Sequence, residues 1–133
     1  MPIFKLRFFF GFVTALILIT GCAAPLGDRV DGENLKVYYL EDVSKQMAID
    51  FAKYWIANGF VGEKEQTIQL LTDEDKVIVK LIEKESYHDE SLGISEVAML
   101  QDLERVLKSD VFQKDVRIWI CDDTFYPLKT ARD

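Results

Sequence analysis

Histidine and cysteine are scarce in this chain of 133 residues, which contains one histidine and two cysteines. A structural zinc site takes four ligands, more than these residues supply together. Basic residues are also in the minority, with 16 lysines and arginines against 23 acidic residues. Proteins that bind nucleic acid neutralise phosphates with basic side chains, so the charge balance argues against that function. We predict no metal, no cofactor and no nucleic-acid partner.

A hydrophobic run long enough to span a membrane is also missing. The stretch from Phe8 to Ala24 falls slightly short of the roughly 20 residues that a membrane-spanning helix needs, and Pro25 interrupts it. Lys5 and Arg7 precede the stretch, with no acidic residue among them. A basic start followed by an apolar segment of about 7–15 residues is typical of a secretory signal peptide. We therefore predict that residues 1–21 are a leader.

The end of the apolar stretch reads Ile-Thr-Gly-Cys over residues 19–22. This sequence resembles the lipobox of bacterial lipoproteins. The resemblance implies a diacylglycerol on the sulfur of Cys22, cleavage between Gly21 and Cys22, and a fatty acyl chain such as palmitate on the new amino group. Several acyl chains would hold the protein firmly, because each buried CH₂ contributes about 0.8 kcal/mol. An ordinary signal peptide, or an uncleaved anchor with a chance cysteine, is the alternative.

The same resemblance bears on localisation. Ala23, and not aspartate, follows the cysteine. In enterobacterial lipoproteins that pattern implies transfer to the outer membrane, facing the periplasm, and the inner membrane stays open. The expected location is the cell envelope, with the membrane itself as a partner through the anchor.

Removal of the leader makes the chain more acidic. Lys5 and Arg7 leave with it, so 14 basic residues remain against 23 acidic ones, a net charge of −9. This balance argues against electrostatic adhesion to anionic lipid and suits a partner with a basic face. Cys121 is then the second and last cysteine, so no internal disulfide is expected.

Residues 22–34 read as the lipidated cysteine and a tether. The segment is polar and contains Pro25, Gly27 and Gly32, which favour irregular structure. If it is flexible, its root-mean-square reach is roughly 20 Å. The remaining residues, 35–133, are predicted to form one domain.

Hydrophobic periodicity predicts six elements in that domain. Asp42 is the expected cap of the first helix, Asn58 and Gly59 its expected stop, and Pro127 limits any last strand to a sheet edge. A stripe of Met99, Leu100, Leu103, Val106 and Leu107 marks the second helix. In chain order, the elements are a strand at 35–40, a helix from 43 to 57, strands at 67–72 and 77–82, a helix around 96–107 and a strand at 115–121.

The order strand, helix, strand, strand, helix, strand predicts an α+β fold. It matches the βαββαβ pattern of ferredoxin-like domains, a two-layer sandwich in which two helices pack on one face of an antiparallel sheet. Other two-layer arrangements with the same order remain open. The domain also resembles small uncharacterised bacterial α+β domains, through Tyr38-Tyr39 and Ile120-Cys121-Asp122, and this resemblance implies no activity.

Each candidate catalytic motif in the sequence is incomplete. The glycines and lysine of residues 59–64 lack the spacing of a phosphate-binding loop and read as a connecting turn. Ser95 lacks the second glycine of a nucleophile elbow, and His88 lies in a polar loop. The acidic turn at 73–75 lacks the calcium-loop pattern. Cys121 precedes two aspartates, which would raise the pKa of its thiol, so it reads as a packed strand cysteine.

One face of the sheet should lack helices, and it is the predicted docking surface. If Tyr39, Ile78 and Trp119 share that face, they form an apolar patch for a protein or peptide. The predicted function is that of a membrane-anchored, non-enzymatic envelope lipoprotein that binds another envelope protein. Two alternatives are a binding protein for a small apolar ligand, using the aromatic residues, and an enzyme with a carboxylate pair that spacing does not reveal.

Overall fold

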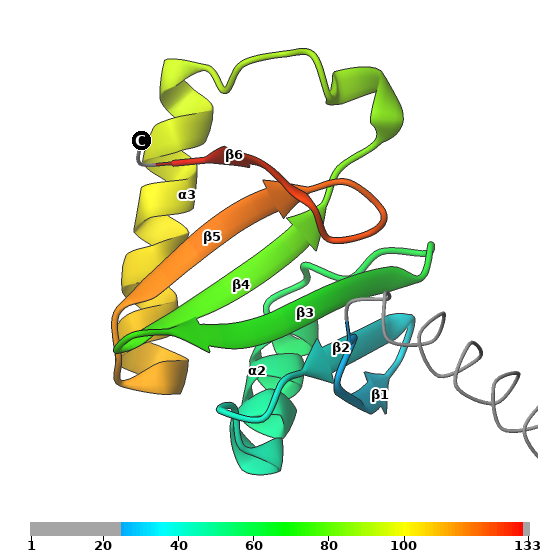
Figure 1. The fold of residues 1–133 in the computed structure, drawn as a ribbon, viewed down its shortest axis with the longest axis vertical. Coiled ribbons are helices and arrows are strands. Elements are labelled where there is room, and N and C mark those ends of the chain that lie inside the picture. Colours follow the sequence, from blue (N-terminus) through cyan, green and yellow to red (C-terminus); the bar gives the residue numbers. More distant parts are fainter. Residues whose placement is uncertain (1–24, 132–133) are drawn as a thin grey trace, which may run out of the picture.

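The computed structural model describes residues 25–131, which form one mixed sheet of six strands covered by two helices (Figure 1). The predicted leader, Gly21 and the lipidation site Cys22 lie outside the described residues. The strands are β1 (Asp28–Gly32), β2 (Leu35–Tyr39), β3 (Gln66–Asp73), β4 (Lys76–Ile82), β5 (Val116–Cys121) and β6 (Pro127–Thr130). The helices are α2 (Lys45–Ala57) and α3 (Ile94–Leu107), with short helical turns η1 (Glu85–Tyr87) and η2 (Lys108–Phe112).

The strands lie in the sheet in the order in which they occur along the chain, β1 to β6. Strands β2 and β3 are parallel neighbours joined through α2, and β4 and β5 are parallel neighbours joined through α3. The other three pairs are antiparallel. The α+β class is confirmed, but the ferredoxin-like order and the antiparallel sheet are wrong. In a split βαβ unit another strand separates the two strands that a helix connects, and hydrophobic periodicity does not encode that gap.

Strand β1 occupies part of the segment that was expected to be a flexible tether. Val30 pairs with Val37 of β2 and packs against the core, while its neighbours Arg29 and Asp31 form an ion pair of 2.8 Å. A strand with one apolar residue between charges is a common form of a protected sheet edge. Its composition resembles that of a loop, which is why the sequence pattern missed it.

Helix α2 begins two residues later than Asp42 predicted. Ser44 is its N-cap, and the Ser44 hydroxyl accepts a hydrogen bond of 3.1 Å from the backbone N–H of Met47. The predicted stop is confirmed: the Asn58 N–H donates to the carbonyl of Tyr54, and Gly59 has a φ of +77°. Both ends are therefore satisfied by local hydrogen bonds.

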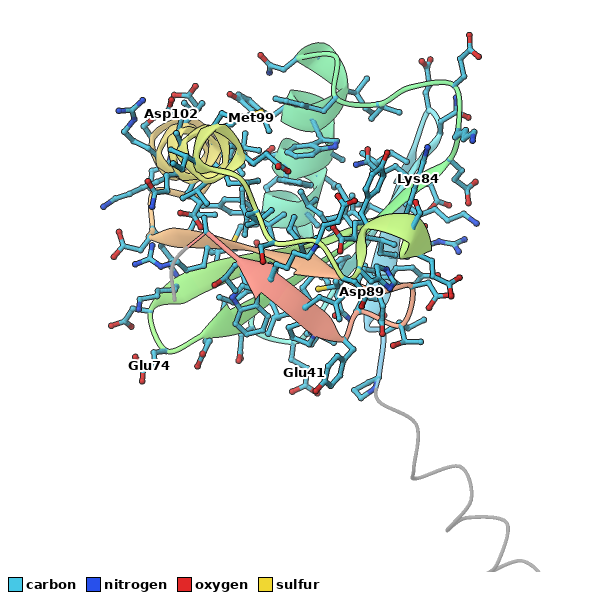
Figure 2. The ribbon with its side chains drawn as sticks, turned by 90° about the horizontal axis from the view of Figure 1, so that it is seen from above. Glu41, Glu74, Lys84, Asp89, Met99 and Asp102 are labelled. Atoms are coloured by element: carbon cyan, nitrogen blue, oxygen red, sulfur yellow. The ribbon has the colours of Figure 1, made fainter. Side chains whose placement is uncertain are left out.

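The hydrophobic core lies between the helices and one face of the sheet, and the view from above shows both helices on that face (Figure 2). Phe51 of α2 is fully buried, with its ring 5.1 Å from that of Trp55 and 5.8 Å from that of Phe112. The sheet contributes a row of fully buried aliphatic side chains, Val37, Ile68, Leu70, Val77, Val79 and Ile118.

Helix α3 is fastened to β5 by a buried carboxylate. Glu104 is 3 % exposed, and its Oε2 accepts a hydrogen bond of 2.8 Å from the backbone N–H of Ile118. Strand β6 pairs with β5 only from Trp119 onward, so no β6 carbonyl is available to Ile118. The side chain of Glu104 takes the place of that carbonyl at this edge of β5. A buried backbone N–H without an acceptor would be costly, and the glutamate supplies the acceptor.

Candidate functional site on the open face of the sheet

The face of the sheet that points away from the helices is called the open face here. Successive side chains of a strand point to opposite faces. Because Val79 and Ile118 belong to the helix-covered core, their neighbours Ile78, Lys80 and Trp119 point to the open face. On β3, Gln69 lies between the core residues Ile68 and Leu70 and therefore points the same way.

The predicted docking residues Tyr39, Ile78 and Trp119 do not form one patch. Tyr39 pairs with Leu70 and packs against the helix-covered core, so it lies on the other face. Ile78 is on the open face but only 2 % exposed. Trp119 remains partly exposed there, with the ammonium of Lys80 5.5 Å from its ring centroid. Val37 and Tyr39 are two residues apart on β2, so both point to the helix-covered face.

Two chain segments cover part of the open face. The side-chain amide of Gln69 donates a hydrogen bond of 3.1 Å to the carbonyl of Leu26, which holds residues 25–27 against the sheet. The ammonium of Lys80 donates one of 3.1 Å to the carbonyl of Phe125, which holds the β5–β6 loop. Gln69 and Phe125 are buried as a result, with 4 % and 6 % of their surfaces exposed.

Between these segments lies a shallow cavity of about 480 Å³, called the open-face groove here. Its lining is mostly apolar, and the two polar side chains with long reach, Gln69 and Lys80, already bind backbone carbonyls. Such a groove suits contact with apolar or amphipathic groups better than acid–base chemistry. It is lined by Pro25, Leu26, Leu40, Gln69, Leu71, Lys80, Thr124, Phe125, Tyr126 and Pro127.

Asp122 organises the loop that forms one wall of the groove. Its Oδ1 accepts hydrogen bonds from the Thr124 hydroxyl at 2.7 Å, the Thr124 N–H at 2.9 Å and the Tyr126 N–H at 3.0 Å. These bonds lower the pKa of the Asp122 carboxyl, and the bond from the Thr124 hydroxyl contributes most. The loop is thus held by a local network, and Phe125 adopts a left-handed φ of +64° within it.

Cys121 is a packed strand cysteine, as predicted. Its side chain is fully buried at the end of β5, and burial raises the pKa of the thiol to about 11. Lys80 opposes this rise and Asp122 adds to it. A thiol with such a pKa is almost entirely protonated near neutral pH, which does not suit a nucleophile.

The remaining residues that the sequence singled out are not brought together. His88 is partly buried beside β4, where its Nε2 lies 3.3 Å from the carbonyl oxygen of Glu83, and Ser95 is in the first turn of α3. The acidic turn around Glu74 is exposed at the far end of the β3–β4 hairpin. Among residues 25–131, no three histidine, cysteine, aspartate or glutamate side chains are grouped so as to hold a metal ion.

A second ion pair, which the sequence did not reveal, ties β6 to the loop after β4. Lys129 Nζ lies 2.9 Å from Oε1 and 3.2 Å from Oε2 of Glu83, and only the latter contact has hydrogen-bond geometry. Both side chains are largely buried, and the same ammonium donates to the carbonyl of Tyr87. Partners 46 residues apart leave no local pattern that could predict their contact.

Helix α3 exposes apolar side chains to solvent. Ile94 is 93 % exposed and Met99 is 63 % exposed, although the sequence placed Met99 in the buried stripe. Met99 lies on the flank of α3 nearest α2, on the side of the molecule opposite Glu41 (Figure 2). Only Leu100, Glu104 and Leu107 of this helix are fully buried. Helix α3 therefore contacts the sheet over a narrower stripe than its apolar residues in the sequence predicted.

Comparisons with models of protein families, with curated proteins and with solved structures find no match for this chain. Within the described part of the chain, no helix has the length and apolar character that crossing a bilayer requires.

Proposed function

We propose that this protein is a lipoprotein of the bacterial cell envelope, anchored through lipid on Cys22, whose domain binds another envelope protein. The observation that carries the anchoring is the sequence Ile-Thr-Gly-Cys at residues 19–22, directly after a basic start and an apolar stretch. Leu26, four residues after Cys22, is hydrogen-bonded to Gln69 of the sheet, so the domain would sit beside its membrane.

The partner surface in this proposal is the solvent-exposed part of α3, because Ile94, in its first turn, and Met99, on its flank nearest α2 (Figure 2), are exposed apolar side chains. Methionine is flexible and polarisable and is frequent on surfaces that bind proteins. Asp102 is exposed on the same helix in an ion pair of 2.9 Å with Arg105, and the excess of acidic residues comes from the chain as a whole, which without its leader carries a net charge of −9. A partner with an apolar patch edged by basic side chains would complement this surface.

The anchoring is tested by replacing Cys22 with serine. We expect the wild-type chain to incorporate labelled palmitate and to sediment with membranes, whereas Cys22→Ser should remain an unlipidated precursor. Cys121→Ser is the matched control, because it removes the other cysteine and should leave lipidation intact. Acylated, processed product from Cys22→Ser would disprove the anchoring.

The partner surface is tested by placing a photoreactive amino acid at Ile94, at Met99 or at Lys84 in cells of the source bacterium. Lys84 is exposed and lies far from α3 (Figure 2), so it serves as the control. We expect adducts of one mass from Ile94 and Met99, none from Lys84, and loss of both when Cys22→Ser is added. Equal adducts from all three positions would mean that α3 is not the binding surface.

A further inference from the structure

We propose that Leu26 and Tyr126, at the rim of the open-face groove, rest on the zwitterionic headgroup layer of the membrane that holds the anchor. The sheet would then face the bilayer and the helices would face away from it. This inference rests on the proposed anchoring through Cys22. It adds a contact surface and a fixed orientation, which anchoring alone does not provide.

The first step is that the chain leaves the sheet at a fixed point. The carbonyl of Leu26 accepts the hydrogen bond of the buried Gln69 amide. Gly27 has a φ of +92°, and a Cβ atom there would lie 2.2 Å from the backbone oxygen of Tyr39. Only glycine tolerates both that conformation and that approach. Pro25 and Leu26 are therefore held on the open face.

The second step is the short covalent distance to the anchor. Three peptide units join Cys22 to Pro25, and each spans at most about 3.6 Å, so their Cα atoms are at most about 11 Å apart. The polar layer of one leaflet is roughly 6 Å thick, from a bilayer of about 42 Å with a hydrocarbon core of about 30 Å. Side chains next to Pro25 are thus within reach of the headgroups.

The third step is the chemistry of those side chains. Leu26 is 46 % exposed and Tyr126 is 67 % exposed, and both line the same groove. Tyrosine favours the boundary between lipid and water, because its ring is apolar and its hydroxyl is polar. Ile94 and Met99 are also exposed, but they belong to α3, which covers the other face of the sheet (Figure 2).

Charge decides which lipid fits. Acidic residues lie on both sides of this rim. Asp28, Glu41 and Asp42 line a second cavity, which shares Pro25 and Leu40 with the open-face groove, and Asp122 and Asp123 belong to the β5–β6 loop. Figure 2 shows Glu41 on the side of the sheet away from the helices. The nearby ammonium of Lys80 is already bound to Phe125. Anionic lipid would therefore be repelled, and a zwitterionic surface is expected to hold the rim best.

The test uses the mature acylated protein in phosphatidylcholine nanodiscs that contain a small amount of lipid with a gadolinium chelate on its headgroup. Paramagnetic broadening of backbone amide signals reports which residues lie near the headgroups. We expect strong broadening at Leu26 and at residues 124–128, and none at Ile94 and Met99. Adding phosphatidylglycerol should reduce the broadening of the rim.

Two double variants sharpen the result. Leu26→Ser with Tyr126→Ser should lose the selective broadening of residues 124–128, because the rim no longer enters the interface. Ile94→Ser with Met99→Ser also removes two exposed apolar side chains, from the helix side, and should leave the headgroup-induced broadening as it is in the wild type. Both pairs are exposed, so the folded spectrum should persist in each.

Even broadening over the whole domain, or broadening strongest at α3, would overturn the contact while leaving the anchoring intact, since the acylation is read separately by mass spectrometry. If the wild-type chain is not acylated in cells, the proposed function fails first. Coupling a lipid maleimide to Cys22 of the mature chain then tests the rim by itself, because Cys121 is fully buried.

Discussion

At the scale of single residues, Cys121 shows how a neighbour in sequence and a neighbour in space can differ. The two following aspartates predicted a raised pKa for the thiol, and the pKa is raised, but burial is the larger cause. Only the structure shows that the ammonium of Lys80 works against the rise. The sequence predicted the direction of the pKa shift of Cys121 but not its principal cause, which is burial.

The raised pKa predicts a slow thiol. With a pKa of about 11 in the folded protein against the usual 9.0, the thiolate fraction near pH 8 falls about 100-fold. We expect Ellman's reagent to label Cys121 about 100-fold more slowly in the native protein than in urea, using a chain expressed without residues 1–21 and carrying Cys22→Ser. Similar rates in both conditions would show that the end of β5 opens readily.

The same shift gives the stability a pH dependence in the alkaline range. As pH rises, the unfolded chain loses the thiol proton first, near pH 9, and the folded protein loses it near pH 11. The contribution of this thiol is therefore complete below pH 9 and declines up to pH 11. Urea denaturation of wild type and Cys121→Ala should show the decline in wild type and a flatter profile in the variant.

At the scale of elements, the sequence predicts those that have strong periodicity. Strand β2, the β3–β4 hairpin, both helices and β5 were all expected within a few residues of their bounds. Strand β1 was missed because one valine among charged residues carries no alternation. The parallel pairing of β2 with β3 was missed because a crossover helix can return to the neighbouring position or skip one.

The candidate site was less predictable than the fold. It is built from contacts between residues 43 and 45 positions apart, those of Gln69 with Leu26 and of Lys80 with Phe125. Such pairs follow from the strand order, which local patterns do not fix. Trp119 alone of the three predicted docking residues remains partly exposed on the open face.

Glu104 gives an element-scale prediction about how α3 is held. Glu104→Ala removes the acceptor of the Ile118 N–H and should lower the free energy of unfolding by roughly 2 kcal/mol. Glu104→Gln keeps an oxygen acceptor of the same reach, so its loss should be smaller. Urea denaturation gives both values, and hydrogen exchange of the Ile118 amide should accelerate in the alanine variant only. Equal losses would show that the charge of Glu104, rather than its acceptor, holds the helix.

At the scale of the whole molecule, the direction in which the chain leaves the sheet connects the fold to the proposed function. Residues 25–27 lie on the open face, and the helices cover the other one. An anchor at Cys22 would therefore place the two faces in different surroundings, lipid on one side and the aqueous compartment on the other. Four exposed apolar side chains divide accordingly, with Leu26 and Tyr126 at the open face and Ile94 and Met99 on helix α3.

This arrangement predicts that the length of chain between the anchor and the domain determines how firmly the rim is held at the headgroups. An insertion of about twelve glycine and serine residues between Ala24 and Pro25 extends the reach by roughly 20 Å in root-mean-square terms. We expect acylation and the free energy of unfolding to stay unchanged, because β1 and the Gly27 contact are preserved. The headgroup-induced broadening at residues 124–128 should weaken strongly, since a weak contact of a small rim depends on the high local concentration that a short link imposes.

A rigid proline-rich insertion of equal length should weaken the broadening further, because it holds the domain away from the surface. Undiminished broadening with both insertions would mean that the rim binds lipid strongly by itself, and that the short link is not what orients the domain.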